Sequence, residues 1–147
     1  MTGWKITFIR LLLAAILGGL IGLEREKKGT SAGLRTHILV CVGSALIMLT
    51  SIYIYDIYEG KAPVDPGRIA AGVVTGIGFL GAGTIMRDRE GIRGLTTAAS
   101  VWVSSAIGLA VGCGYTTAAV ATTLITFLTL SVLRWAEKRL VKDDEQL

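Results

Sequence analysis

Histidine, cysteine and proline are scarce in this chain of 147 residues, which has one histidine, two cysteines and two prolines. One histidine excludes a histidine cluster for zinc, and neither cysteine has a partner at metal-ligand spacing. His37 is the one imidazole base, and no nucleophile motif accompanies it, so a Ser-His-Asp arrangement finds no support. The sequence therefore predicts no enzymatic activity, no metal centre and no cofactor.

Charge is absent over long stretches. Residues 69–86 and 94–133 form uncharged runs of 18 and 40 residues, and 52% of the chain is hydrophobic. About 20 apolar helical residues span a bilayer core of roughly 30 Å. A net charge of +4 suggests nucleic acid in a soluble protein, but here the basic residues flank the apolar runs, and no basic stripe with interleaved aromatics exists. We therefore expect a lipid bilayer as partner and no nucleic acid.

Five transmembrane helices are predicted, which makes the chain an all-α membrane protein. The spans are residues 4–23, 38–57, 69–86, 95–112 and 115–133. The last two share one uncharged run, which the turn Gly112-Cys113-Gly114-Tyr115 divides. The first span is followed by charges without a small-residue cleavage site, so we expect an uncleaved anchor. Residues 1–133 form the predicted transmembrane domain, and residues 134–147 a short charged cytoplasmic tail.

Lysine and arginine are unevenly shared between the two sides of these spans. The side with residues 24–37, 87–93 and the tail carries 11, whereas the other side carries four: Lys5, Arg10, Lys61 and Arg68. The positive-inside rule then places the N-terminus outside and the C-terminus in the cytoplasm.

Cys41 and Cys113 lie near opposite faces, too far apart for a disulfide. Arg10 either snorkels to the nearer interface or is a buried functional charge.

Glycine is abundant in the third span, at positions 72, 76, 78, 81 and 83. Small residues let transmembrane helices approach closely, so we expect residues 69–86 to be the central packing helix. The predicted packing positions are Gly76, Gly78, Gly81 and Gly83, together with Gly18 and Gly22 on the first span. Gly76, Gly78 and Gly81 also spell G-x-G-x-x-G, but no βαβ pattern surrounds them, so nucleotide binding finds little support.

An internal repeat is predicted at an offset of 61 residues. Residues 33–46 match residues 94–107 at seven of 14 positions. Helices 1–2 and helices 3–4 would then be parallel units related by an axis along the membrane normal. The offset pairs Glu26 with Arg87 and Lys27 with Asp88. These charges either form ion pairs between the two inner loops or are solvated runs.

Two polar clusters are the candidate sites. The inner cluster contains Glu24, Arg25, Glu26, Arg35, Thr36, His37, Arg87, Asp88, Arg93, Thr96 and Thr97. The outer cluster contains Asp56, Glu59, Asp65 and Arg68. Carboxylates are ligands for Mg²⁺, so the outer acids could attract one weakly, or they are ordinary loop charges. His37 is either an interface-level polar residue or a pH-sensing group.

Four stretches of the chain resemble the MgtC/SapB family of bacterial inner-membrane proteins. They are LLLAAILGGLIGLEREKKG, AGLRTHILVCVGSAL, DPGRIAAGVVTGIGFLGAGTIMRD and IRGLTTAASVWVSSAIGLAVGCG, and they cover most of residues 10–133. The resemblance singles out residues on three inner and outer segments: Glu24, Arg25, Gly33, Arg35, Thr36, Asp65, Arg68, Gly94, Leu95, Thr96 and Thr97. It also includes the glycines of the third span.

The resemblance implies a role in growth under magnesium limitation and, in pathogens, in survival inside host cells (virulence). The resemblance implies that members regulate other membrane machines, including ATP synthase, and are less similar to magnesium carriers. We therefore expect a regulator that docks on a membrane-protein partner, with homo-oligomerisation left open. The alternative is an ion or solute transporter or channel, for which Mg²⁺ is a candidate. Transport normally needs ionisable groups at mid-membrane, and spans two to five lack them.

Overall fold

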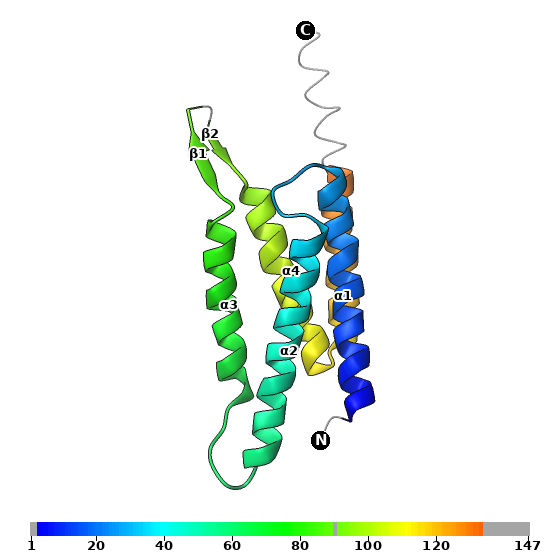
Figure 1. The fold of residues 1–147 in the computed structure, drawn as a ribbon, viewed down its shortest axis with the longest axis vertical. Coiled ribbons are helices and arrows are strands. Elements are labelled where there is room, and N and C mark those ends of the chain that lie inside the picture. Colours follow the sequence, from blue (N-terminus) through cyan, green and yellow to red (C-terminus); the bar gives the residue numbers. More distant parts are fainter. Residues whose placement is uncertain (1–2, 90, 134–147) are drawn as a thin grey trace.

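The structure is a computed structural model that describes residues 3–89 and 91–133. Five helices form an elongated bundle, and a short antiparallel hairpin projects from one end (Figure 1). The elements are α1 (Trp4–Lys27), α2 (Leu34–Tyr58), α3 (Pro66–Ala82), β1 (Met86–Asp88), β2 (Gly91–Arg93), α4 (Leu95–Cys113), α5 (Thr116–Leu128) and a π-helical turn, η1 (Thr129–Leu133). The predicted tail, residues 134–147, lies outside the described residues.

Helix α4 is the centre of the bundle, because it contacts each of the other four helices. Helix α2 packs along α4, α1 lies beside both, and α5 runs behind α1 (Figure 1). Helix α3 stands at the edge of the bundle and contacts α2 and α4. The core lies between α1, α2, α4 and α5, where Leu17, Ile21, Cys41, Ile107 and Val111 are buried.

Glycines bring α1, α2 and α4 into close contact. A Cβ built on Gly22 would lie 2.7 Å from the Cα of Leu34, and one on Gly18 would lie 2.8 Å from the Cβ of Cys41. On the other side of α2, a Cβ on Gly112 would lie 2.6 Å from the Ala45 carbonyl oxygen, and one on Gly108 would collide with the Cys41 carbonyl. Such close helix approach is what small residues allow in membranes.

The prediction that the third span is the central packing helix is wrong for the single chain. Only Val73, Ile77 and Gly81 of α3 are buried, on one stripe at a spacing of four residues. A Cβ on Gly81 would make ordinary contact with Ala98, whereas one on Gly72, Gly76 or Gly78 would meet no atom within 4 Å. Gly83 ends the helix as its C-cap. The glycine count of this segment indicates that close packing is possible, but it does not supply a neighbour.

The turn predicted at residues 87–93 is a hairpin. Met86 pairs with Arg93, Arg87 with Ile92 and Asp88 with Gly91. Helix α3 ends at Ala82, four residues before the predicted end of the span, and Gly94 leads into α4 with a φ of 90°. A side chain at Gly94 would collide with the Thr84 carbonyl, so the backbone crosses here at a distance that only glycine permits.

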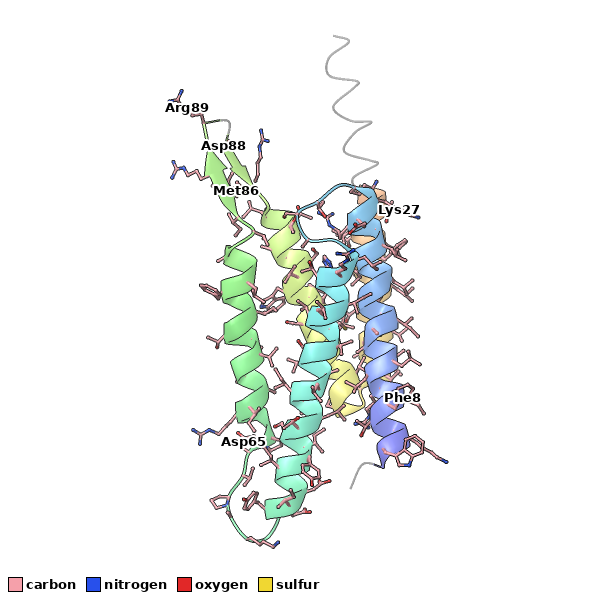
Figure 2. The ribbon with its side chains drawn as sticks, viewed as in Figure 1. Phe8, Lys27, Asp65, Met86, Asp88 and Arg89 are labelled. Carbon is pink, nitrogen blue, oxygen red and sulfur yellow. The ribbon has the colours of Figure 1, made fainter. Side chains whose placement is uncertain are left out.

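Three helices, α1, α2 and α4, are long and apolar enough to cross a membrane. Helix α3 and residues 116–132 are shorter apolar helices. The helical, membrane-type architecture is thus confirmed, while the count of five crossings stays a prediction. Side chains cover the outside of the helices (Figure 2). Many of them are large and apolar, as expected for contact with lipid; Leu39 is 70% exposed and Phe79 81%.

The internal repeat also stays a prediction. The offset of 61 residues aligns Leu34 with Leu95, at which α2 and α4 begin. The two preceding glycines differ in conformation, because Gly33 has a φ of −107° and Gly94 one of 90°. The surroundings of the paired helices differ as well, since α1 contacts α5 and α3 stands at the edge.

Candidate functional site

The residues of the predicted inner cluster fall into two groups. Glu24, Arg25, His37 and Thr97 are buried, on the last turns of α1 and the first turns of α2 and α4. These helix ends lie at the end of the bundle that carries the hairpin (Figure 1). Thr36 is half-buried. The remaining members are exposed: Glu26, Arg35, Arg87, Asp88, Arg93 and Thr96. The sequence therefore predicted the right end of the molecule but not which of its polar residues lie inside.

Glu24 and Arg25 form a buried charged pair on the last turns of α1. The Arg25 Nη1 lies 3.7 Å from the Glu24 Oε2, and each side chain is 5% exposed. Neither carboxylate oxygen of Glu24 accepts a hydrogen bond from the described residues. The positive charge of Arg25 near the C-terminal end of α1 is favourable toward the helix dipole. Removing Arg25 would leave the buried Glu24 carboxylate without this partner, which costs several kcal/mol.

His37 links α2 to α4 and is fully buried. Its Nδ1 lies 2.8 Å from the Gly33 carbonyl oxygen, and because a carbonyl only accepts, Nδ1 carries the hydrogen. Its Nε2 lies 3.1 Å from the Ser100 Oγ, which is 2.8 Å from the Thr97 carbonyl oxygen. In the neutral ring, Nε2 accepts a hydrogen bond from the Ser100 hydroxyl. In a charged ring, Nε2 would donate to the Ser100 Oγ, and the Ser100 hydroxyl would donate to the Thr97 carbonyl oxygen. Glu24 and Arg25 lie near enough to the ring to act on it electrostatically.

The loop between α1 and α2 is held by local hydrogen bonds. The Glu26 Oε2 accepts from the Leu34 backbone N–H at 2.9 Å, and the Thr30 Oγ1 lies 3.0 Å from the Arg25 carbonyl oxygen. Asp88 lies 3.4 Å from Arg93 within the hairpin. Glu26 and Asp88, the acidic members of the two candidate inter-loop pairs, thus have partners nearby in sequence. Whether these charges also pair between the inner loops or are solvated stays open, as the sequence left it.

At the opposite end, Arg10 binds the end of α4. Its Nη1 donates to the Gly112 carbonyl oxygen at 2.8 Å, across 102 residues of sequence. The next glycine, Gly114, has a φ of 89°, and a Cβ there would lie 2.6 Å from Arg10. Of the two alternatives for Arg10, the structure shows a partly buried charge with a structural role, because a cation at a helix C-terminus satisfies free carbonyls and the dipole.

The predicted outer residues begin α3. Asp65 is the N-cap, and its carboxylate accepts from the Gly67 N–H at 2.8 Å, while Arg68 is exposed. Ser51 donates to the Pro66 carbonyl and ties this helix start to α2. Within residues 3–89 and 91–133, no group of three His, Cys, Asp or Glu is placed to hold a metal ion. Asp65 therefore has a structural role that needs no ion.

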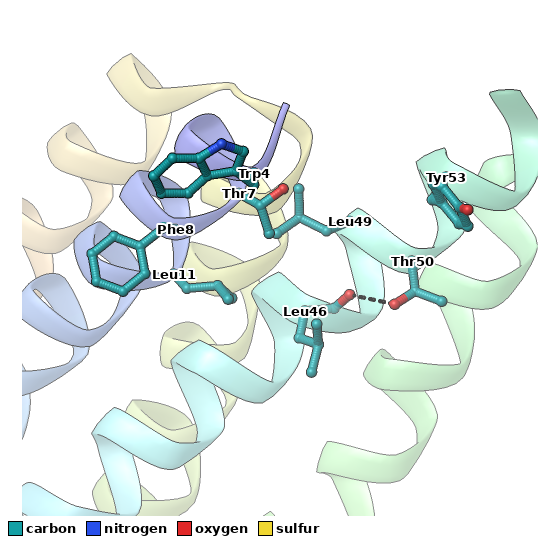
Figure 3. Close-up of a pocket in the computed structure, with 8 residues that line it drawn as sticks. All are labelled: Trp4, Thr7, Phe8, Leu11, Leu46, Leu49, Thr50 and Tyr53. Atoms are coloured by element: carbon teal, nitrogen blue, oxygen red, sulfur yellow. Dashed lines mark hydrogen bonds between the residues drawn. The ribbon is translucent and has the colours of Figure 1, made fainter. Parts of the chain in front are cut away.

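Two apolar grooves open on the outside of the helices. One, of about 590 Å³, lies between the first half of α1 and the second half of α2, where Trp4, Phe8, Leu49 and Tyr53 line it (Figure 3). The other, of about 420 Å³, lies between α2 and α3 and includes Gly43, Gly72 and Gly76. In a membrane, lipid chains or other helices contact such surfaces.

A stripe of small residues on α4 was not identified from the sequence. Ser100, Ser104, Gly108 and Gly112 follow one another every four residues and face the neighbouring helices, all of them buried. This small-xxx-small spacing was present in the sequence. The larger number of glycines in residues 72–83 drew the prediction there instead.

Apolar helices with charges confined to their ends define a helical membrane protein. The comparisons with known proteins agree, since the model of the MgtC family matches residues 11–139. The chain belongs to the MgtC family, and the resemblance found in its sequence is confirmed. No solved structure matches.

Relatives with curated descriptions come from several bacteria. "Putative magnesium transporter YhiD" of Escherichia coli K12 is 46% identical over 95% of this chain and 66% of its own length. "Protein MgtC" of Salmonella typhimurium LT2 is 46% identical over 90% of this chain and 54% of its own length. An uncharacterized protein of Haemophilus influenzae is 39% identical over 91% and 60%. The chain thus spans roughly half to two thirds of these relatives.

Proposed function

We propose that this chain is a regulatory protein of the bacterial inner membrane that docks on the helices of another membrane protein during growth under magnesium limitation. It crosses the membrane five times, with its N-terminus outside and its C-terminus in the cytoplasm. Its family and the magnesium-related name of one relative support the setting. Because the chain spans only part of its relatives, the proposal concerns the membrane part alone.

The observation that carries the docking proposal is the open glycine face of α3. Gly72 and Gly76 lie four residues apart on this face, and a Cβ added to either, or to Gly43 across the groove on α2, would meet no atom of the described residues within 4 Å. Each helical glycine costs about 1 kcal/mol relative to alanine, with no compensating contact inside this chain. Small residues on a transmembrane helix allow another helix to approach closely. A partner's transmembrane helix lying along α3 would make use of them.

The distribution of charge supports docking over transport. Arg10 is bound at one end of the bundle, and Glu24, Arg25 and His37 lie near the other. Between these ends the buried polar groups are hydroxyls, of which Ser105 and Thr123 each donate to a carbonyl of their own helix at 2.8 Å. Ion pathways normally carry ionisable groups at mid-membrane.

Capture of partners from native membranes tests the docking proposal. The double substitution Gly72→Leu and Gly76→Leu fills the open face, so we expect it to remove a stoichiometric partner after cross-linking and purification. Ala121→Leu, on the exposed face of α5, is the matched control and should retain the partner. Equal recovery of the partner with both variants would reject α3 as the docking helix.

Transport is the second candidate, and the buried Glu24–Arg25 pair next to His37 is the observation that favours it. Purified protein in liposomes would then carry an ion flux that Glu24→Gln abolishes. Glu26→Gln, on the exposed side of the same helix end, is the control. Flux without a partner, lost only in Glu24→Gln, would favour transport over docking.

A further inference from the structure

The β1–β2 hairpin combines exposed arginines with exposed aliphatic side chains. Met86 is 68% exposed and Ile92 58%, and both lie on strands that no helix covers. Each of these two residues pairs with an arginine on the opposite strand, Met86 with Arg93 and Ile92 with Arg87. Figure 2 shows Met86, Asp88 and Arg89 projecting from the hairpin beyond the end of the bundle.

The two faces of the hairpin differ in charge. Side chains alternate between faces along a strand, and paired residues share a face. Asp88, Met86 and Arg93 therefore lie on one face, where Asp88 and Arg93 are 3.4 Å apart. Arg87 and Ile92 lie on the other face, and the described residues show no ion pair to Arg87 or to Arg89 near the tip. This second face offers positive charge next to an apolar side chain.

The hairpin is short enough to stay close to the membrane surface, because its reach exceeds the headgroup layer by only a few Å. Three residues per strand reach about 10 Å at roughly 3.3 Å per residue. The headgroup layer on each side of the hydrocarbon core is roughly 5–7 Å thick. Because three residues separate α3 from the hairpin and one residue separates the hairpin from α4, its base starts in this layer. Arg87 and Ile92 pair across the strands at the same height, so the charge and the apolar side chain both lie at the level of the lipid headgroups.

We propose that the β1–β2 hairpin is a binding site for anionic phospholipid headgroups at the cytoplasmic surface of the membrane. Arg87 and Arg89 bind the lipid phosphates, and Ile92 inserts between the headgroups. Basic residues next to an anionic leaflet gain about fivefold in binding each, and the gain decreases with salt. Exposed aliphatic side chains beside the arginines distinguish this surface from a purely electrostatic one.

The test uses the full chain in nanodiscs of phosphatidylcholine, with or without phosphatidylglycerol. Cys113→Ser removes the exposed thiol, and Ile92→Cys carries an environment-sensitive fluorophore next to Arg87. We expect phosphatidylglycerol to move the probe to an apolar setting, where a spin label at the headgroup level quenches it. High salt should reverse this change. A probe that reports water in both kinds of nanodisc would overturn the proposal.

Matched variants distinguish lipid binding by the hairpin from attraction by the other basic residues on the same side of the membrane. Arg87→Gln with Arg89→Gln should weaken retention of phosphatidylglycerol about 25-fold, as two independent arginines would. Lys27→Gln with Lys28→Gln removes two exposed charges from the other loop and should leave the probe signal unchanged. Equal effects of the two variants would overturn the proposal. So would a probe shielded in native membrane vesicles but not in anionic nanodiscs, which would assign the hairpin to a protein partner.

Discussion

At the scale of single residues, glycines with identical chemistry have opposite surroundings in this protein. Gly22 and Gly108 lie where backbones of neighbouring helices meet, whereas Gly76 faces open space. The cost of adding a methyl group therefore depends on the neighbour and not on the helix propensity. Packing between helices, which the sequence does not show, decides whether a Gly→Ala substitution raises or lowers the free energy of unfolding.

We predict that Gly22→Ala and Gly108→Ala each lower the free energy of unfolding by about 1–3 kcal/mol, as overpacking does. The added Cβ would lie 2.7 Å from the Leu34 Cα in the first variant and collide with the Cys41 carbonyl in the second. Gly76→Ala should leave stability unchanged or raise it by up to about 1 kcal/mol. Thermal unfolding in detergent, followed by circular dichroism, measures all three. Destabilisation by Gly76→Ala equal to the others would mean that α3 has a neighbour in the purified protein.

The buried site was only partly predictable at this scale. Glu24, Arg25 and Thr97 were among the predicted residues, but Arg35 and Arg87 were as well, and these are exposed. All of them flank apolar runs, so composition alone cannot separate them. The separation depends on which side of a helix faces the bundle, and Ser100 became part of the site only when α2 and α4 were placed together.

At the scale of elements, the helices were predicted well and their ends less well. The first span was predicted to end at residue 23, but α1 continues to Lys27, and α2 begins at Leu34 and not at residue 38. Charges end the crossing of a membrane but not a helix, because the backbone hydrogen bonds continue into the interface. The start of α3 was readable from Asp65 and Pro66, a capping residue followed by a proline at the first helical position.

This capping role of Asp65 gives a test against a cation-binding role. Asp65→Ala should lower the free energy of unfolding by about 1 kcal/mol, because the Gly67 N–H loses its acceptor. Asp65→Ser supplies a hydroxyl acceptor and should retain most of the stability. Thermal unfolding with and without magnesium chloride measures both effects. A stabilisation by magnesium in the parent that is lost in both variants would show that the carboxylate binds the cation.

At the scale of the whole molecule, the bundle has two polar ends and an apolar middle. The hairpin and the α1–α2 loop lie at one end, and the start of α1 and the α2–α3 loop at the other (Figure 1). The sequence predicted this division from its uneven lysines and arginines. It did not predict that α4 is central, because every span is apolar and hydropathy does not show which helices contact one another.

The orientation of the bundle gives a further prediction. A maleimide that does not cross membranes should label the exposed Cys113 in intact cells whose outer membrane is permeable to it. Ile92→Cys in a Cys113→Ser background should be labelled only after the inner membrane is opened. The buried Cys41 should resist the reagent in both cases. Labelling of position 92 from outside would invert the proposed topology.

The hydrogen bond from Arg10 to Gly112 has a consequence for synthesis. The first helix emerges from the ribosome with a guanidinium whose acceptor is made 102 residues later. Until then this charge has to find water or a lipid phosphate at the nearer interface, as arginines near helix ends do. The first helix therefore reaches its final place only after the fourth has been inserted. A chain interrupted before Gly112 lacks the carbonyl that accepts the Arg10 hydrogen bond.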